Sequence, residues 1–261
     1  MSAATRAPAA PAAGRAPRAA FLAHNPFGDP WTIGFFYREK MRAIHRIAPD
    51  ESFRDVLEVG GGQGGLTGLL YPAARVVNVD ANVCHGRAEP NQRAHTRFLC
   101  GDATALPFPE ASFDAVTMFD LLEHVPDDGS AAREAWRVLR PGGALLVSSP
   151  SQHWRFPYYR ALARWCPSEA EILADWGHVR RGYSLQQLEA LVGRPIESWA
   201  SFLSPVTVLG HDVSFSKLSH RARHQLCAAL GPLTWTAYAL HRRHARGTEN
   251  AALWRKPRGR P

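Results

Sequence analysis

A stretch of ten residues, 56–65, constrains the fold of this chain more than any other feature of the sequence. It opens with an apolar run at residues 56–59 that is rich in β-branched side chains and is typical of a buried strand. Glycines dominate the rest of the stretch, and because glycine has no Cβ and adopts φ > 0, a ligand can lie directly on this backbone. Residues 66–70 then have the apolar spacing of a helix that packs on a sheet. Strand, glycine turn and helix together predict a nucleotide-type ligand site at the carboxyl end of a parallel strand.

The glycine pattern fits two classes of ligand. A G-x-G-x-x-G pattern begins at Gly60 and matches the dinucleotide fingerprint, and Asp80 ends the next expected strand, where a ribose-binding acid belongs. An E-x-G-x-G-x-G pattern begins at Glu58, and it resembles motif I of the class I S-adenosylmethionine (SAM)-dependent methyltransferases. The turn alone therefore does not separate a dehydrogenase from a methyltransferase.

Two downstream segments favour the methyltransferase interpretation. Gly-Asp-Ala at 101–103 follows the third expected strand, and Arg-Val-Leu-Arg-Pro-Gly-Gly at 137–143 precedes the fifth. Both resemble the same methyltransferase family, and neither is expected of a dehydrogenase. The resemblance covers residues 56–149 and continues more loosely toward the C-terminus, and an NAD-binding oxidoreductase is kept as the remote alternative.

The expected fold is α/β, a Rossmann-like doubly wound sheet of seven strands. The alternation of strand and helix patterns over residues 56–149 supports it. An amphipathic helix is expected at 128–140, with Gly142 as its left-handed stop. Two C-terminal helices, 218–230 and 233–246, are expected to break at Gly231-Pro232. Strands are expected at 56–59, 75–80, 97–101, 112–119, 144–149, 197–203 and 251–257, the last one antiparallel.

Composition sets the domain organisation. With 261 residues and 45% hydrophobic residues, the chain can bury one full core. Residues 1–20 are rich in Ala, Pro and Arg and predict a disordered tail, which leaves 21–261 as the methyltransferase domain. No apolar run approaches the ~20 residues of a membrane span, and no signal-peptide core is visible. The four cysteines show no CxxC pair, so we expect no disulfide framework, no metal site and a cytoplasmic location.

The net charge of +8 is concentrated at the two ends of the chain. Residues 1–20 hold three Arg and no acid, and residues 220–261 hold nine Lys or Arg and one acid. The middle of the chain is slightly acidic, which argues against a nucleic-acid partner for the body of the domain. The basic C-terminal segment is compatible with peripheral contact to anionic lipid, or with a solvated charged face.

The resemblance assigns roles to the residues that follow the strands. It implies that Asp80 accepts hydrogen bonds from the ribose hydroxyls, that Asp102 accepts one from the adenine amino group, and that Ala103 N–H faces the adenine ring. The turn at 119–120 is expected near the methionine end of SAM. The expected cofactor-binding residues are Glu58, Gly60, Gly61, Gly62, Gly64, Asp80, Ala81, Asp102, Ala103, Phe119 and Asp120.

The acceptor side is expected between two aromatic segments. Residues 150–183, after the fifth strand, are crowded with aromatic side chains and are interpreted as an acceptor lid, and residues 31–37 form the second segment. The carboxyl end of the fifth strand is expected to open onto the same face as Gly60, so the acceptor is expected between the two segments. The residues expected to bind substrate are Tyr37, Trp154, Tyr158, Trp176, His178 and Arg181.

The sequence therefore predicts a SAM-dependent methyltransferase for a small-molecule, sugar or natural-product acceptor, acting by in-line displacement. The Phe-Asp-Leu-Leu-Glu-His-Val segment at 119–125 resembles the small-molecule branch of the family, and so do the residues around 178–184. O-methylation is favoured, with N and C acceptors open. The displacement runs with or without a histidine base, which matters only for a hydroxyl acceptor, and the candidates for it are His124, His178 and His153. The alternative is a methyltransferase for a lipid-linked glycan, or for a nucleic acid or protein recruited by the basic C-terminal segment.

Overall fold

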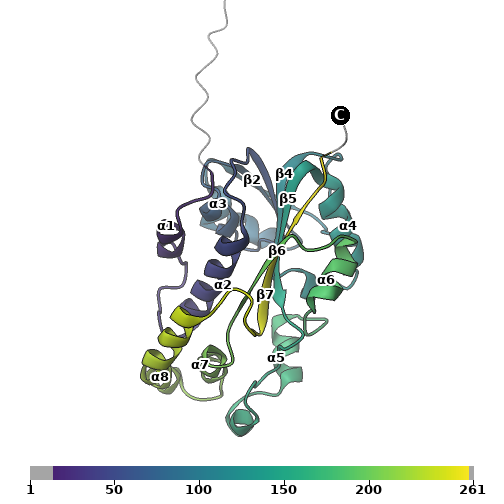
Figure 1. The fold of residues 1–261 in the computed structure, drawn as a ribbon. Helices are drawn as coiled ribbons and strands as arrows, with labels where there is room; N and C mark the ends of the chain where they lie inside the picture. Colours follow the sequence, from purple (N-terminus) through teal and green to yellow (C-terminus); the bar gives the residue numbers. More distant parts are fainter. Residues whose placement is uncertain (1–13, 259–261) are drawn as a thin grey trace, which may run out of the picture.

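The computed structural model describes residues 14–258 of the chain (Figure 1). Most of the expected tail, residues 1–13, lies outside the described residues, as do residues 259–261. Helix α1 (Arg18–Ala23) begins inside the expected tail, so the boundary expected at residue 20 falls within a helix. Its Phe21 is buried in the core, which ties this segment to the folded domain.

A seven-stranded sheet forms the centre of the molecule, with the strand order β3-β2-β1-β4-β5-β7-β6. Neighbouring strands from β3 to β5 are parallel, and β7 runs antiparallel to both β5 and β6. This topology confirms the Rossmann-like doubly wound sheet and its antiparallel last strand. The strands are β1 (Asp55–Val59), β2 (Arg75–Asp80), β3 (Thr96–Cys100), β4 (Phe113–Phe119), β5 (Leu139–Pro150), β6 (Ser198–Phe202) and β7 (Glu249–Arg255).

Helices cover both faces of the sheet and give it two apolar cores. On one face, α2 (Ile33–Ile47), α3 (Leu66–Leu70) and α8 (His220–Leu240) contribute buried side chains to one cluster. On the other face, α4 (Asp128–Val138) and α6 (Leu185–Val192) complete a second cluster (Figure 1). The remaining helices are α5 (Glu169–Trp176), α7 (Thr207–Ser214) and the 3-10 turns η1 (Val83–Arg87), η2 (Glu89–Gln92), η3 (Leu122–His124) and η4 (Arg160–Trp165). No helix within residues 14–258 combines the length and the apolar character needed to cross a bilayer.

The junction between α4 and β5 differs from the expectation. The helix ends at Val138 and the strand begins at Leu139, so Gly142 lies within β5 and does not end the helix. Leu139 pairs with Phe113, and the register then shifts before Ala144 pairs with Ala115. Gly142 accommodates this irregularity with φ +82°. The helix therefore ends earlier than expected, because Leu139 pairs with a neighbouring strand instead of continuing the helix.

The expected break at Gly231-Pro232 is wrong, because α8 is one helix that contains Pro232, and the helix ends before residues 241–246. Gly231 is packed against Trp31: a Cβ at Gly231 would lie 2.5 Å from Trp31 Cζ3. Packing of this kind overrides the local helix-breaking preference of the dipeptide.

Residues 150–183 form an extension after β5 that contains η4 and α5. This extension has a separate apolar cluster, formed by the buried residues Trp154, Phe156, Cys166 and Ile172. Helix α5 begins with a capping box between Ser168 and Glu171, and α6 begins with another between Ser184 and Gln187. The aromatic density of this segment therefore partly reflects a small local core.

Candidate functional site

The glycine turn lies between β1 and α3, as the sequence predicts. Gly60 has φ +68° and its added Cβ would lie 2.4 Å from Leu121 Cδ1. Gly64 has φ +77° and its Cβ would lie 2.2 Å from Asn91 Oδ1. No other residue type fits this backbone without displacing its neighbours. The turn is therefore a strictly glycine-dependent cradle at the carboxyl end of β1.

Glu58 lies in β1, just before the turn, and is 3% exposed. Its Oε1 accepts hydrogen bonds from Thr67 Oγ1 at 2.7 Å and Thr67 N at 3.3 Å. Its Oε2 is buried and has no hydrogen-bond partner among residues 14–258. Burial raises the pKa of this carboxyl group above its ordinary value, although the Thr67 hydrogen bonds oppose the shift. A cationic or hydrogen-bonding ligand group in the turn would supply the partner that Oε2 lacks.

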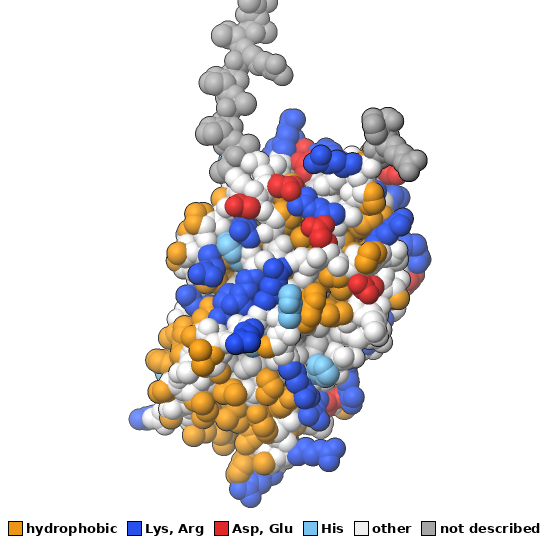
Figure 2. All heavy atoms as spheres, in the orientation of Figure 1, with side chains coloured by type: hydrophobic (Ala, Val, Ile, Leu, Met, Phe, Trp, Pro, Cys, Tyr) orange, Lys and Arg blue, Asp and Glu red, His pale blue; other side chains and the backbone are white. Residues whose placement is uncertain are grey.

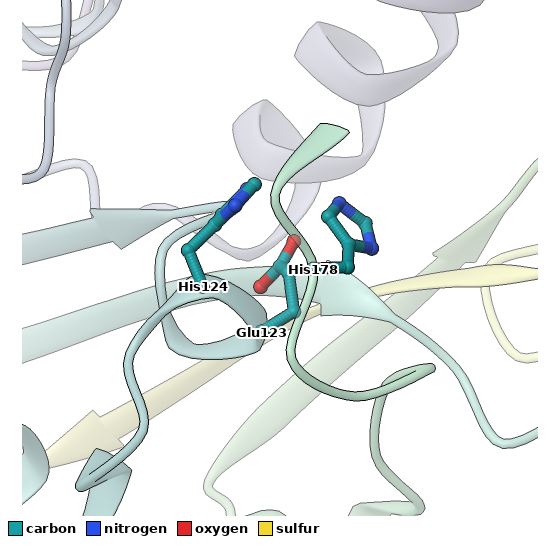
Figure 3. A group of neighbouring side chains, drawn as sticks. All are labelled: Glu123, His124 and His178. Atoms are coloured by element: carbon teal, nitrogen blue, oxygen red, sulfur yellow. The ribbon is translucent and has the colours of Figure 1, made fainter. Parts of the chain in front are cut away.

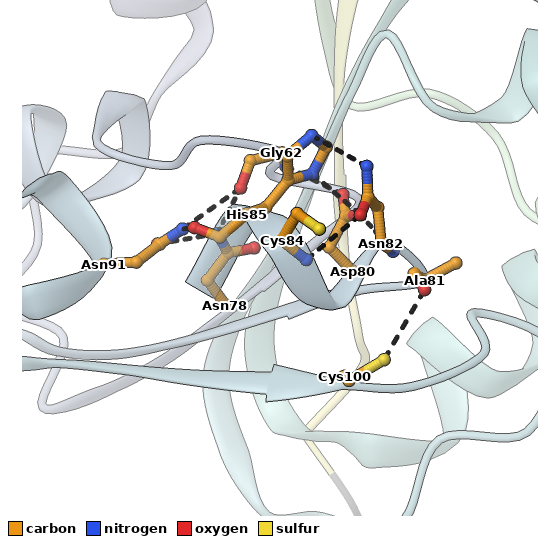
Figure 4. A network of polar contacts seen from close by, with 9 residues as sticks. All are labelled: Gly62, Asn78, Asp80, Ala81, Asn82, Cys84, His85, Asn91 and Cys100. Carbon is orange, nitrogen blue, oxygen red and sulfur yellow. Dashed lines mark hydrogen bonds and ion pairs between the residues drawn. The ribbon is translucent and has the colours of Figure 1, made fainter. Parts of the chain in front are cut away.

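Asp80 connects the glycine turn to the segment after β2 (Figure 4). Its Oδ2 accepts a hydrogen bond from Gly62 N at 2.8 Å, and its Oδ1 accepts one from Asn82 N at 2.9 Å. His85 Nδ1 lies 3.0 Å from Oδ1. The acid is thus located beside the glycine backbone, where a ribose-binding residue is expected.

Two asparagines that the sequence analysis did not single out hold the same turn. Asn78 and Asn91 are both buried, and Asn78 Nδ2 donates to Asn91 Oδ1 at 2.8 Å. Asn91 Nδ2 lies 3.1 Å from Gly62 O and 2.9 Å from His85 O (Figure 4). An asparagine in the middle of an apolar strand, as at Asn78, is the signal that could have revealed this support.

The residues expected near the adenine lie at the same sheet edge, because β1, β2 and β3 are adjacent and parallel. Asp102 follows β3 and is exposed, and its Oδ1 accepts a hydrogen bond from Thr104 N at 2.8 Å, which lowers the pKa of the carboxyl group. Ala103 is half-buried against the second core. Ala81 follows Asp80, and its carbonyl oxygen lies 3.5 Å from Cys100 Sγ.

Asp120 follows β4 and has an unusual backbone, with φ +49°. Its carboxylate accepts hydrogen bonds from Lys40 Nζ at 2.5 Å and Ser148 Oγ at 2.6 Å. Burial would raise the pKa of Asp120, but the Lys40 ammonium and the Ser148 hydroxyl outweigh it and leave the pKa below its ordinary value. The preceding residue, Phe119, is buried. Lys40, from α2, is a site residue that the sequence analysis missed.

A cavity of about 410 Å³ opens beside Asp120. Its walls come from α2 and the segment before it, from the end of α5, and from α7 and the strand ends β6 and β7. Most of its lining is aromatic or aliphatic, with a few polar groups. The lining residues are Phe27, Ile33, Phe36, Tyr37, Lys40, Asp120, Glu123, His124, Pro150, Trp176, His178, Phe202, Leu203, His211, Phe215 and Glu249.

Three of the expected substrate residues, Tyr37, Trp176 and His178, line this cavity. The other three lie outside its lining. Trp154 is buried in the local cluster of residues 150–183, Tyr158 packs under the Arg155 guanidinium, and Arg181 bonds to Glu169 on the surface. Of the expected aromatic segment 31–37, Trp31 packs on α8 instead. His153, the third candidate base, is also outside the cavity and exposed.

A polar cluster of Glu123, His124 and His178 lies in the wall of the cavity (Figure 3). The two imidazole rings meet edge to face, with centroids 4.6 Å apart. Burial, and then the neighbouring His124, lower the pKa of His178 to about 4, so this ring is neutral near pH 7. Burial and the nearby Asp120 raise the pKa of Glu123. The pKa of Glu249 is raised by burial and by its two acidic neighbours, Asp120 and Glu123. The cluster can accept a proton from a group held in the cavity.

Comparison with known proteins finds similarity to methyltransferases over the strands that carry the glycine turn. The family model described as "Methyltransferase domain" matches residues 57–147. A probable SAM-dependent methyltransferase of Mycolicibacterium smegmatis is 38% identical over 122 residues, which is 45% of this chain and 46% of that protein. The ubiquinone/menaquinone biosynthesis C-methyltransferase of Hahella chejuensis is 41% identical over 102 residues, which is 35% of this chain and 41% of that protein. The demethylmenaquinone methyltransferase of Roseiflexus castenholzii is 38% identical over 151 residues, or 54% and 63% of the two chains.

The chain spans less than half the length of the first of these relatives. Among solved structures, the N-methyltransferase NodS from Bradyrhizobium japonicum superposes with a TM-score of 0.54 at 17% identity, covering 90% of this chain and 96% of its own. A SAM-dependent methyltransferase from Thermotoga maritima gives a TM-score of 0.54 at 20% identity, covering 85% and 90%. At these identities the likeness concerns the fold.

Proposed function

Since this chain carries a class I SAM-dependent methyltransferase domain, we propose that it transfers the methyl group of SAM to an apolar, ring-bearing small molecule. The observation that carries the proposal is the aromatic cavity beside Asp120, at the same sheet edge as the glycine turn. Its size and lining suit a small ring system with one polar group. The match to the methyltransferase model also favours SAM over the dinucleotide that the glycine pattern alone allowed.

The residues at the glycine turn fit SAM. The buried, unpartnered Oε2 of Glu58 would accept a hydrogen bond from the ammonium of the methionine moiety. Asp80 would accept from the ribose hydroxyls, and Asp102 with Ala103 would face the adenine. When bound, SAM supplies an electrophilic methyl group. What the protein adds is mainly position: fixing two reactants can be worth roughly 7–11 kcal/mol of the barrier.

The polar cluster supports an oxygen acceptor. A hydroxyl group must lose its proton as the O–CH₃ bond forms, and the imidazole rings of His124 and His178 lie in the cavity wall, that of His178 being neutral near pH 7. A positioned base of this kind contributes about 10²–10⁴-fold. The sulfur–methyl bond breaks as the oxygen–methyl bond forms, and S-adenosylhomocysteine leaves as the neutral thioether. We therefore propose O-methylation of a phenol or similar hydroxyl-bearing ring.

C-methylation of a hydroquinone is the second candidate, because relatives carry such names. They include a C-methyltransferase of quinone biosynthesis and a 2-methyl-6-phytyl-1,4-hydroquinone methyltransferase. The same base would then remove the phenolic proton while the ring carbon takes the methyl group. The two candidates differ in product, since only the O-methyl product loses a titratable hydroxyl.

An apolar acceptor also fits the outer surface of the protein. Leu226, Leu233 and Leu240 recur every seven residues on α8 and are 45%, 53% and 74% exposed, so they form one apolar stripe on the helix. Figure 2 shows hydrophobic side chains gathered over the region of α8 and α7, with Lys and Arg at its margins. Phe27 and Ile33, at the cavity, are exposed as well. We propose that this surface contacts lipid when the acceptor is collected.

The test combines cofactor binding with an acceptor screen. Calorimetry should give saturable binding of SAM and S-adenosylhomocysteine and weaker or no binding of NADH. Incubation with SAM and a panel of phenols, catechols and hydroquinones, read by mass spectrometry, should then yield a product heavier by one methyl group. Failure to bind SAM, or tighter binding of NADH, would refute the proposed function.

A further inference from the structure

We propose that Glu123, His124 and His178 bind a divalent transition-metal ion in the wall of the acceptor cavity. Methyl transfer from a sulfonium needs no metal, so this site is an addition to the proposed function. The binding itself is independent of that function, whereas the catalytic use of the ion rests on it.

Two segments of the backbone bring the three side chains together. Glu123 and His124 lie on η3, after β4, and His178 follows α5. Val179 N donates to Glu123 O at 2.9 Å, which fixes the two segments side by side. The candidate ligand atoms of the three side chains all lie within 4.8 Å of one another (Figure 3). With metal–ligand bonds of about 2.0–2.2 Å, small side-chain rotations would complete the coordination.

Two of the three side chains carry a buried polar atom without a hydrogen-bond partner among the described residues. Glu123 is 1% exposed, and its Oε2 has no hydrogen-bond partner among the described residues. His178 Nδ1 is likewise buried and unpartnered within residues 14–258. An unpaired buried carboxylate is costly, and a cation between these atoms would satisfy both of them at once.

The charge balance of the cavity favours a cation. The lining contains three carboxylates, Asp120, Glu123 and Glu249, but only one ammonium, Lys40. Lys40 bonds to Asp120, whose other oxygen accepts from Ser148. Asp120 is thus already paired, whereas Glu123 and Glu249 lie in the lining without an ion pair among the described residues, and a bound metal ion would compete with the protonation that burial favours in both acids.

The donor set suits a metal such as Zn²⁺ or Mn²⁺. Two imidazole nitrogens and one carboxylate oxygen are a common protein ligand set for divalent transition metals, with further positions open to substrate or water. His124 Nδ1 lies 3.2 Å from Gly177 O, so this nitrogen carries the hydrogen and leaves the lone pair of Nε2 for the ion. Gly177 itself ends α5 in the left-handed conformation, with φ +70°, which aims its carbonyl oxygen at the ring.

An ion at this position would hold the acceptor by its oxygen and would replace the histidine base, because the imidazole lone pairs would then coordinate the metal. A coordinated hydroxyl group loses its proton more readily, because the metal stabilises the oxyanion. The O–H bond would break with the proton passing to solvent, and the oxygen would then take the methyl group as the sulfur–methyl bond breaks. This narrows the acceptor class to rings with a metal-binding hydroxyl group, such as catechols and hydroquinones.

Metal binding by the full chain tests the site directly. The protein, stripped with a chelator, is titrated in a calorimeter with ZnCl₂ and, separately, with MnCl₂. We expect one ion per chain for at least one of the metals, with affinity reduced at least tenfold in Glu123→Gln and in His178→Asn. His153→Asn is the matched control, because this histidine belongs to the same segment 150–183 but lies outside the cavity and is exposed.

SAM affinity is measured on each variant, and an unchanged affinity indicates that the fold is intact. Absence of binding for both metals, or equal binding in the control and in the two ligand variants, would overturn the site. Methyl transfer at the full rate after chelation would overturn the catalytic role of the ion. Site-dependent metal binding in a protein that does not bind SAM would support the cation site while refuting the proposed function.

Discussion

The carboxylate of Asp80 has two tasks, because it both fixes the glycine turn through Gly62 N and faces the place proposed for the ribose. Asp80→Ala should therefore weaken SAM binding by about 1.5–3 kcal/mol, the worth of hydrogen bonds to a charged group. Calorimetry of SAM binding measures this. Glu89→Ala is the control, since that carboxylate is exposed and bonds only to Arg93 among the described residues. Unchanged SAM affinity in Asp80→Ala would contradict the role of Asp80.

Trp176 should contribute to acceptor binding, because its ring lines the cavity. We expect Trp176→Leu to raise the KM for the acceptor by about tenfold, with SAM affinity unchanged, because Trp176 lines the acceptor cavity and lies outside the glycine turn. Tyr158→Leu provides the comparison, because Tyr158 belongs to the same segment and lies outside the cavity lining. Equal effects of the two substitutions on KM would show that this segment only supports the fold.

At the scale of residues, the sequence predicts the positions at or just after the carboxyl ends of strands. Glu58, Asp80 and Asp102 lie at the expected sheet edge because strand ends in a parallel sheet share one edge. Lys40 and Glu249 could not be anticipated, since they reach the cavity from segments far from the glycine turn in sequence. Their role depends on which helices and strands become neighbours, and no local pattern encodes that.

One buried carboxyl group, that of Glu39, connects helix α2 to the segment between β6 and α7. Glu39 is 1% exposed, and its Oε2 accepts from Leu203 N at 2.6 Å and Thr207 Oγ1 at 3.3 Å. Burial raises the pKa of Glu39 from 4.5 to about 7. Between these two values the folded state keeps a proton that the unfolded state has released, so the free energy of unfolding falls as pH rises. The loss is complete above pH 7 and is on the order of 3 kcal/mol.

Glu39→Gln should remove this pH dependence, because glutamine resembles the protonated acid. From pH 5 to pH 8 the unfolding free energy of the unsubstituted protein should fall relative to that of Glu39→Gln. Denaturant unfolding at each pH measures it, and Glu89→Gln, which replaces an exposed acid of η2, controls for the loss of an acid. Parallel pH curves for Glu39→Gln and the unsubstituted protein would contradict the expectation.

The contact between α8 and the segment before α2 depends on a glycine. In Gly231→Ala the new methyl group would meet the Trp31 ring at 2.5 Å, and we expect a loss of about 1–3 kcal/mol of stability from overpacking. Gly68→Ala, in α3, has nothing within 4 Å of the new Cβ and should gain up to about 1 kcal/mol from helix propensity. Thermal unfolding of both variants checks the signs. A shift of Tm in the same direction in both would contradict the packing argument.

At the scale of elements, the periodic segments were predictable and their ends were not. The strands from 56 to 119 and the helix that begins at Asp128 lie where the apolar patterns place them. The early end of α4 depends on strand pairing at Leu139, and the continuity of α8 through Pro232 depends on packing. Both are tertiary effects that a local pattern does not contain.

At the scale of the whole molecule, the apolar stripe on α8 should direct the protein to lipid. The chain should co-sediment with anionic phospholipid vesicles, and Leu233→Asp combined with Leu240→Asp should reduce the bound fraction several-fold, because charge replaces exposed apolar area. Val83→Asp, which also substitutes an exposed apolar residue but on η1, should bind as the unsubstituted chain does. Equal binding by the two variant proteins would remove the basis for lipid contact.

The order of the strands has a consequence for the synthesis of the chain. Strand β7 lies between β5 and β6, and among the described strands β6 pairs only with β7. A nascent chain that has left the ribosome up to β6 therefore exposes the edge of β5, which is apolar along most of its length. Until residues 249–255 emerge and insert, β6 has no place in the sheet and Glu249 is absent from the cavity wall. A chain whose translation stops before β7 would contain the glycine turn but would lack part of the wall of the acceptor cavity. Its exposed β5 edge would favour aggregation or recognition by chaperones.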